Sequence, residues 1–233
     1  MNAKTEIAGR LPDIETSKPD GRHSGVKRVL AAALALWLGL IFFLGDRGSF
    51  VGNVGSPPLP IAFGFGIPLV VFFTAYLGWS AFRAFVLAVD LRLLAAIQAW
   101  RWAGLGFLSL YAQGILPGLF ALPAGLGDMA IGIAAPWIVL GLIRHPSFAT
   151  SRRHVIWNIM GIVDLIVAVL MGTICSGFFS GIPGTVTTGP MARLPLVLIP
   201  AYLVPIFILL HFTALSQVRQ LARSGKSAPT QNI

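Results

Sequence analysis

Six long apolar stretches constrain this chain more than any other feature of its sequence. Each is about 17–22 residues long, which at 1.5 Å per residue matches a hydrocarbon core roughly 30 Å thick. Lipid offers no partner to backbone N–H and C=O groups, so we expect these stretches to be helices. They cover approximately Val29–Gly45, Ile61–Phe82, Trp102–Ala121, Ala124–Ile143, Val155–Cys175 and Leu194–Leu215. The sequence therefore predicts an all-α, polytopic membrane helix bundle.

Composition supports the same fold class. Of the 233 residues, 56% are hydrophobic and only 11% are charged, whereas a soluble domain has about 25% charged residues. The first 27 residues mix acids, bases, Pro, Gly and Ser, which is typical of a mobile tail. We expect one transmembrane domain over 28–217, between cytoplasmic tails at 1–27 and 218–233.

The positions of Lys and Arg predict how the bundle is oriented. Of the 17 in the chain, 15 fall in the two tails and in the second and fourth connections, and the other two are Arg47 and Arg193. Positively charged loops remain in the cytoplasm, so both termini are expected inside. The net charge of +9 does not indicate nucleic-acid binding, because no basic cluster is interleaved with aromatic residues.

The connection between the second and third spans allows two interpretations. If 83–101 is helical, one face collects Arg83, Asp90, Gln98 and Arg101, and Arg92 lies opposite. Trp100, Arg101 and Trp102 are candidate interfacial anchors at the end of this helix. We favour a helix lying in the cytoplasmic interface. The alternative is one long tilted helix from about Leu93 to Gln113, which would bury Arg101 unless its side chain reaches the interface.

Residues 116–128, LPGLFALPAGLGD, end a run of prolines and glycines on a carboxylate. Such residues are unfavourable inside a helix. We expect this stretch to form the outer turn between the third and fourth spans, with Pro123 in the first turn of the next helix. Asp128 would then either cap that helix or face a cavity below the turn.

Four polar side chains inside predicted spans form the candidate ion or solute site, because ionisable residues in a membrane usually face a bundle interior or cavity. They are Asp164, Asp128, Asn158 and His211. Counting along the predicted spans places Asp128 roughly 6 Å below the outer boundary and Asp164 near the midplane. Asn158 and His211 fall near the cytoplasmic side. The alternatives are structural: a capping role for Asp128, helix packing for Asp164 and Asn158, and a satisfied interfacial histidine for His211.

Motifs for the common enzyme and metal chemistries do not occur. The chain has no H-E-x-x-H, no G-x-S-x-G, no P-loop and no Cys/His metal spacing, and Cys175 is its single cysteine. We therefore expect no cofactor, no metal site and no catalytic residue.

Three blocks of the sequence resemble a known family. They are DLRLLAAIQAWRWAGLGFLSLYAQGILPGLFALPAGLGDMAIGIAAPW (Asp90–Trp137), WNIMGIVDLIVAV (Trp157–Val169) and LPLVLIPAYLVPIFILLH (Leu194–His211). Each is similar to a segment of a family of uncharacterised bacterial multi-pass integral membrane proteins. The resemblance implies a protein of the bacterial inner membrane, with the lipid bilayer as its environment, and it implies no activity.

Three functional hypotheses remain open. The first is a small transporter or permease-like protein that uses the intramembrane carboxylates. The second is a structural or accessory membrane protein that organises a partner complex. The third, which we favour least, is a lipid enzyme with a cytoplasmic pocket that would collect Arg101, His145, His154 and His211. The sequence does not distinguish a monomer from a homo-oligomer.

Overall fold

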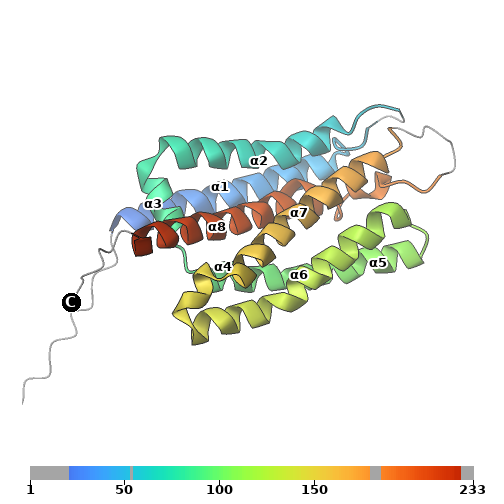
Figure 1. Ribbon diagram of the computed structural model, residues 1–233. Coiled ribbons are helices and arrows are strands. Elements are labelled where there is room, and N and C mark those ends of the chain that lie inside the picture. The colour runs from blue at the N-terminus through green and yellow to red at the C-terminus, as the bar shows by residue number, and fades with distance from the viewer. Residues whose placement is uncertain (1–20, 53–54, 179–184, 227–233) are drawn as a thin grey trace, which may run out of the picture.

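The computed structural model describes residues 21–52, 55–178 and 185–226, and over these ranges the chain is helical (Figure 1). The elements are α1 (Gly21–Asp46), α2 (Leu59–Gly78), α3 (Ser80–Ala88), α4 (Leu91–Ile97), η1 (Gln98–Gly104), α5 (Leu105–Ala112), α6 (Gly118–Arg144), η2 (Pro146–Thr150), α7 (Arg152–Ile174), η3 (Gly189–Ala192), η4 (Ile199–Leu203) and α8 (Val204–Lys226). Elements η1, η2 and η3 are 3-10 helices, and η4 is a π-helix.

Within the described ranges, six helical segments are long and apolar enough to cross a membrane. They are Ser24–Asp46, Leu59–Gly78, Leu91–Ala112, Gly118–Arg144, Arg152–Ile174 and Ile199–Arg223. The all-helical architecture and the number of apolar segments agree with the sequence prediction. Of the predicted tails, 1–20 and 227–233 lie outside the described residues.

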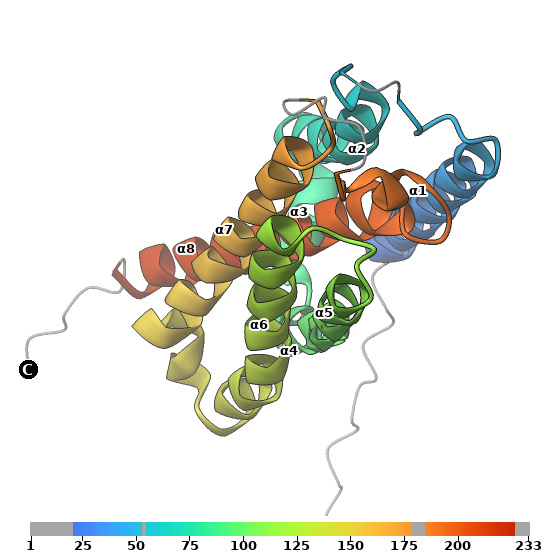
Figure 2. The same ribbon diagram turned by 90° about the vertical axis from the view of Figure 1, so that its right-hand side faces the viewer.

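Helix α7 links two groups of helices. It packs on α6 on one side and on α8 on the other, while α4, α5 and η1 all pack on α6. Helices α2 and α3 pack on α8. Figure 1 shows α1, α2 and α8 running together above the α4–α6 group, and the turned view in Figure 2 shows α7 lying between α6 and α8. The start of α1 and the end of α8 lie at the same end of the bundle.

The third span differs from the interfacial helix that we favoured. It runs from Leu91 to Ala112 through α4, η1 and α5, which is close to the alternative of a long helix from about Leu93. Its start is set by Asp90, whose side chain accepts a hydrogen bond from the backbone N–H of Arg92 at 2.8 Å. Hydrogen bonds from Arg92 also hold the pKa of the Asp90 carboxyl below its usual range. The short helix α3 occupies the preceding connection.

The turn before α6 also lies earlier than predicted. Gly114 has a φ of +71°, its N–H donates to the Tyr111 carbonyl at 2.9 Å, and the Ile115 N–H donates to the Leu110 carbonyl at 2.9 Å. This is a Schellman motif, which ends α5. Helix α6 then begins at Gly118 and contains Pro123 in its interior. Asp128 therefore lies well inside α6, which excludes the capping role considered for it.

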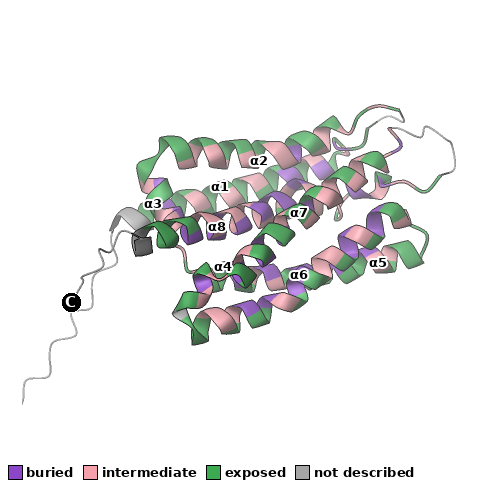
Figure 3. Ribbon diagram, in the orientation of Figure 1, coloured by how far each residue is buried: buried purple, intermediate pink, exposed green. Residues whose placement is uncertain are grey.

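Many large apolar residues are exposed along the helices, and Figure 3 shows buried positions alternating with exposed ones along them. Leu36 is 76% exposed and Leu77 is 74% exposed. Soluble proteins rarely leave large apolar patches in water. This distribution is compatible with a lipid environment around the bundle.

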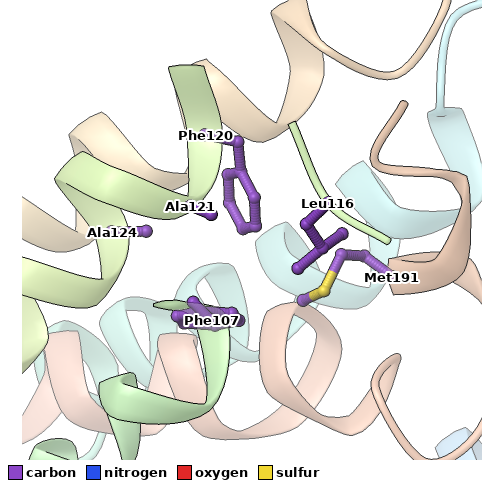
Figure 4. Packing of buried hydrophobic residues seen from close by; sticks show 6 residues of the cluster. All are labelled: Phe107, Leu116, Phe120, Ala121, Ala124 and Met191. Carbon is purple, nitrogen blue, oxygen red and sulfur yellow. The ribbon is translucent and has the colours of Figure 1, made fainter. Parts of the chain in front are cut away.

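An apolar cluster fixes the end of the bundle where α5 turns into α6. Its buried members are Phe107, Leu116, Phe120, Ala121, Ala124 and Met191. The rings of Phe107 and Phe120 meet edge-on, with centroids 5.4 Å apart. Figure 4 shows these rings and the side chains of Leu116 and Met191 pointing toward a shared space. The cluster ties η3, at the end of the α7–α8 connection, to the α5–α6 pair.

The last span begins with an irregular segment that is held by α1 and α2. Pro205 has no N–H to offer the Ala201 carbonyl, and the indole Nε1 of Trp37 on α1 donates to that carbonyl at 3.1 Å. On the other side, Gly64 of α2 lies so close to Ala201 that a Cβ at position 64 would come within 2.8 Å of the Ala201 Cβ. A glycine is therefore required at this contact.

This contact gives a test of the packing. We expect Gly64→Ala to destabilise the protein by about 1–3 kcal/mol, because the added methyl group overpacks the α2–η4 contact. Gly66→Ala, on the same helix, is the control because a Cβ there meets nothing within 4 Å. Thermal unfolding of the purified protein in detergent measures both. Equal melting temperatures for the two variants would contradict the packing described.

Candidate functional site

Arg101, on η1, lies at the centre of a buried polar network. Its side chain is 0% exposed. Its Nε donates to Asp128 Oδ1 of α6 at 2.7 Å, and its Nη2 forms an ion pair with Asp164 Oδ2 of α7. Its Nη1 contacts the Gly161 carbonyl at 3.3 Å and His211 Nε2 of α8 at 3.1 Å. One guanidinium thus joins four elements, and each of its three nitrogens has a partner.

The hydrogen bonds define the protonation of His211. A guanidinium has only donors, so His211 Nε2 must accept the bond from Arg101. The proton of the ring is then on Nδ1, which donates to Asn158 Oδ1 at 2.9 Å. The Asn158 amide in turn donates to the His154 carbonyl at 2.9 Å. His211 is therefore a neutral imidazole that orients Arg101, and the ring of Trp157 packs edge-on against it with centroids 5.3 Å apart.

Glycines make the space that this network occupies. A Cβ at Gly161 would collide with the His211 ring, and a Cβ at Gly127 would collide with the Asp164 carboxylate. At Gly104 a Cβ would come within 2.6 Å of the Asp128 Cβ. These glycines of η1, α6 and α7 therefore allow the helices to approach closely enough for the charged groups to meet.

The structure brings together all four residues of the predicted ion or solute site: Asp164, Asp128, Asn158 and His211. It also adds Arg101, which the sequence analysis had placed in the interface. This is a correction, because the side chain is paired inside the bundle and does not reach the surface. Trp100 and Trp102, the other two predicted anchors, are 74% and 56% exposed on the outside of the same segment.

The charged groups of the network lie far from the ends of their helical segments. Asp128 and Arg101 lie ten residues into their helical segments and Asp164 lies twelve residues into α7, so each is about 15–18 Å from the end of its span. His211 is twelve residues after Ile199, at a similar level. The helix that carries His211 continues to Lys226, beyond the limit of Leu215 that was predicted for the last span. The charged groups meet near the middle of the spans.

The formal charges of the network do not cancel. Arg101 carries one positive charge, Asp128 and Asp164 carry one negative charge each when ionised, and His211 is neutral. Isolated buried charge is costly, so groups of this kind tend to be neutralised by a partner or by a proton. The network therefore has room for one further positive charge.

A cavity of about 360 Å³ reaches the network from one end of the bundle. Its walls come from α2, α5, α6, α7, η3, η4, the first residue of α8 and the connections that follow α1 and α7. Asp128 is the network residue that lines it; Arg101, Asp164 and His211 do not. Apolar side chains dominate the walls, among them Phe107, Phe120, Leu165 and Met191. One carboxylate of the network therefore lies in the cavity wall.

The fold and the site define a class: an all-helical protein, compatible with membrane insertion, that buries an arginine between two aspartates beside a cavity. Comparison of the sequence with models of protein families then identifies the family of the chain. The family described as a domain of unknown function, DUF8737, matches residues 58–219. The match covers more than half of the chain and includes the whole network, so the protein belongs to this family. No curated protein and no solved structure matches the chain.

The network predicts an unusual pattern of stabilities. Arg101→Met leaves two carboxylates buried without their partner, and we expect a loss of about 3–5 kcal/mol. Asp128→Asn alone, or Asp164→Asn alone, leaves one balanced ion pair and should cost less. The triple variant R101M/D128N/D164N should recover much of the stability that R101M loses. Thermal unfolding in detergent measures all four.

If Arg101→Met is tolerated, or if the triple variant is less stable than R101M, the guanidinium is not the charge that holds the two aspartates.

Proposed function

We propose that the protein is a small transporter of the permease kind, which carries a solute past the Arg101–Asp128–Asp164 network. The observation that carries this proposal is the cavity of about 360 Å³, which has a network carboxylate in its wall. An ionisable group at mid-membrane depth is a typical mark of a substrate or ion pathway. An apolar pocket with few polar groups is the usual form of a small-molecule site.

The excess negative charge suggests how transport is driven. Either a proton on one of the two carboxylates or a cationic solute beside Asp128 neutralises the network, and both together would leave it positive. Binding of one therefore opposes binding of the other. The charged and titratable groups that face the site are Arg101, Asp128, Asp164 and His211, with His154 one hydrogen bond beyond Asn158. Exchange of solute for protons follows from this competition.

Irregular helix geometry supports movement at the site. The third span contains the 3-10 segment η1, which carries Arg101, and the last span begins with the π-helix η4, which lines the cavity. Such departures from α-helical geometry inside a long helix often mark functional hinges. A change of shape in η1 would move Arg101 and the network, and a change in η4 would move a wall of the cavity.

A second candidate is a structural or accessory membrane protein. The observation in its favour is that Arg101 is paired at every nitrogen and joins η1, α6, α7 and α8, as a purely structural ion pair would. The lipid enzyme has less support, because Arg101, His145, His154 and His211 do not line the cavity.

Accessibility of the cavity from both membrane faces distinguishes a transporter from an accessory protein. In a Cys175→Ser background, which removes the single cysteine, we introduce Ala168→Cys into the α7 wall of the cavity. A transporter must expose this wall to each side in turn. A membrane-impermeant thiol reagent should therefore label it in right-side-out vesicles and in inverted vesicles.

Leu170→Cys is the control, because Leu170 lies on the same helix and is exposed on the outside of the bundle, where lipid should exclude the reagent. Labelling of Ala168→Cys from one face only, or from neither, would contradict transport and favour the accessory role.

We also propose that the protein lies in a bacterial inner membrane with both termini in the cytoplasm. With Arg101 moved into the third span, 14 Lys and Arg remain on the predicted cytoplasmic side, against Arg47 and Arg193 on the other. Fluorescent-protein fusions at either terminus should therefore fluoresce, and alkaline phosphatase fused after Arg47 should be active. An active phosphatase fused at either terminus would reverse the orientation.

A further inference from the structure

Three of the four side-chain hydroxyl groups that line the cavity in the described residues already donate their proton within the protein. Thr173 Oγ1 donates to the Val169 carbonyl at 2.9 Å, Ser176 Oγ donates to the Thr173 carbonyl at 2.7 Å, and Thr188 Oγ1 donates to the Gly172 carbonyl at 2.7 Å. A hydroxyl has one proton. Since each proton is already used, the lone pairs are what these side chains offer to the cavity.

Asp128 adds an acceptor that carries charge. Its Oδ1 takes the hydrogen bond from Arg101, while its Oδ2 has no hydrogen-bond partner among the residues that the structure describes. The side chain keeps 16% of its surface exposed, and it lines the cavity. Among the described residues that line the cavity there is no Lys, Arg or His. The side-chain polar groups of this described lining thus include a carboxylate and no cation.

The remaining walls select for an apolar body. Phe107 and Phe120 lie edge-on to each other at the α5–α6 side, and Leu165 and Val204 contribute from α7 and α8. Ring faces are also weakly attractive to a cation. A charged head without an apolar body would leave these walls unfilled.

We infer that the cavity binds an organic cation: a protonated amine whose N–H groups meet Asp128 and whose apolar body lies among the phenyl rings. The ligand brings one positive charge, which is the charge that Arg101, Asp128 and Asp164 lack together. An anion would meet an unpaired carboxylate oxygen and hydroxyl lone pairs, which repel it. A neutral isostere fits the walls but leaves the network charged. This inference names the class of solute for the proposed transporter. The biological role of the binding rests on that proposed function, but the binding itself is measured in a separate experiment.

The probe is 2-phenylethylamine, a primary amine with one ring, which is small enough for a cavity of about 360 Å³. The full-length protein in lipid nanodiscs is titrated with the amine, and the melting temperature is followed, because a ligand that binds only the folded state raises it. The neutral control is 2-phenylethanol, and the anionic control is phenylacetate. We expect the amine to raise the melting temperature and to bind about 10- to 100-fold more tightly than the alcohol, as hydrogen bonds to a charged group are worth more than neutral ones.

Two variants locate the binding. Asp128→Asn removes the charge but leaves the Arg101–Asp164 pair, and it should abolish the preference for the amine over the alcohol. Ala168→Phe fills the cavity and leaves the network intact, so it should weaken both ligands. Leu170→Phe, on the outer surface of the same helix, is its control and should bind like the parent protein. A melting curve without ligand shows that each variant is folded.

The inference is overturned if the amine and the alcohol bind equally, if phenylacetate binds best, or if Asp128→Asn retains the preference for the amine. Amine binding with labelling of Ala168→Cys from one face only would uphold the cation site and reject transport. Two-sided labelling without a preference for the amine would uphold transport and reject the organic cation. The two proposals therefore fail in different experiments.

Discussion

The ion pairs of Arg101 with Asp128 and Asp164 are the interaction on which the bundle depends. They hold the third, fourth and fifth spans together at mid-depth, and the contact with His211 adds the last span. In an apolar medium the cost of burying each charge is large, and it is offset only when the partners and the remaining hydrogen bonds are all in place. The positions of four helices are therefore linked. A displacement of any one of them exposes an unpaired charge to the interior.

The number and type of the spans could be predicted from the sequence, because a stretch of about 20 apolar residues has few alternatives to a helix. The limits of the third and fourth spans could not. Pro and Gly in 116–128 predicted a turn from local conformational preference, yet Gly118 packs against the Tyr111 ring and Gly125 lies against Leu108. These glycines serve close contact between α5 and α6. Gly114, with its positive φ, is the residue that forms the turn.

The candidate site was predicted in part. Asp128, Asp164, Asn158 and His211 could be selected because polar residues are rare in such spans. Arg101, which contacts all of these except Asn158, was missed. Arg101 lies between Trp100 and Trp102, and a base beside aromatic residues is also typical of a membrane interface. The local sequence pattern therefore does not distinguish an interfacial Arg101 from a buried one. The signal that could have found it was the charge balance: two acids in neighbouring spans had no predicted base. A single guanidinium has three nitrogens and can pair with both aspartates. The alternative of a long helix for the third span already predicted that Arg101 would be buried.

Whether the network is structural or functional depends on where its unbalanced negative charge lies. A network that only holds helices together is most stable when its charges cancel, and an equal number of acids and bases would achieve this. Here two carboxylates share one guanidinium, and of these charged groups it is Asp128 that lines the cavity. A residual charge buried far from any cavity would be neutralised permanently by a proton. A residual charge beside a cavity can instead be neutralised by whatever enters. In the proposed transporter, the position of Asp128 would therefore make the uneven ion-pair network a site whose charge state depends on its occupant.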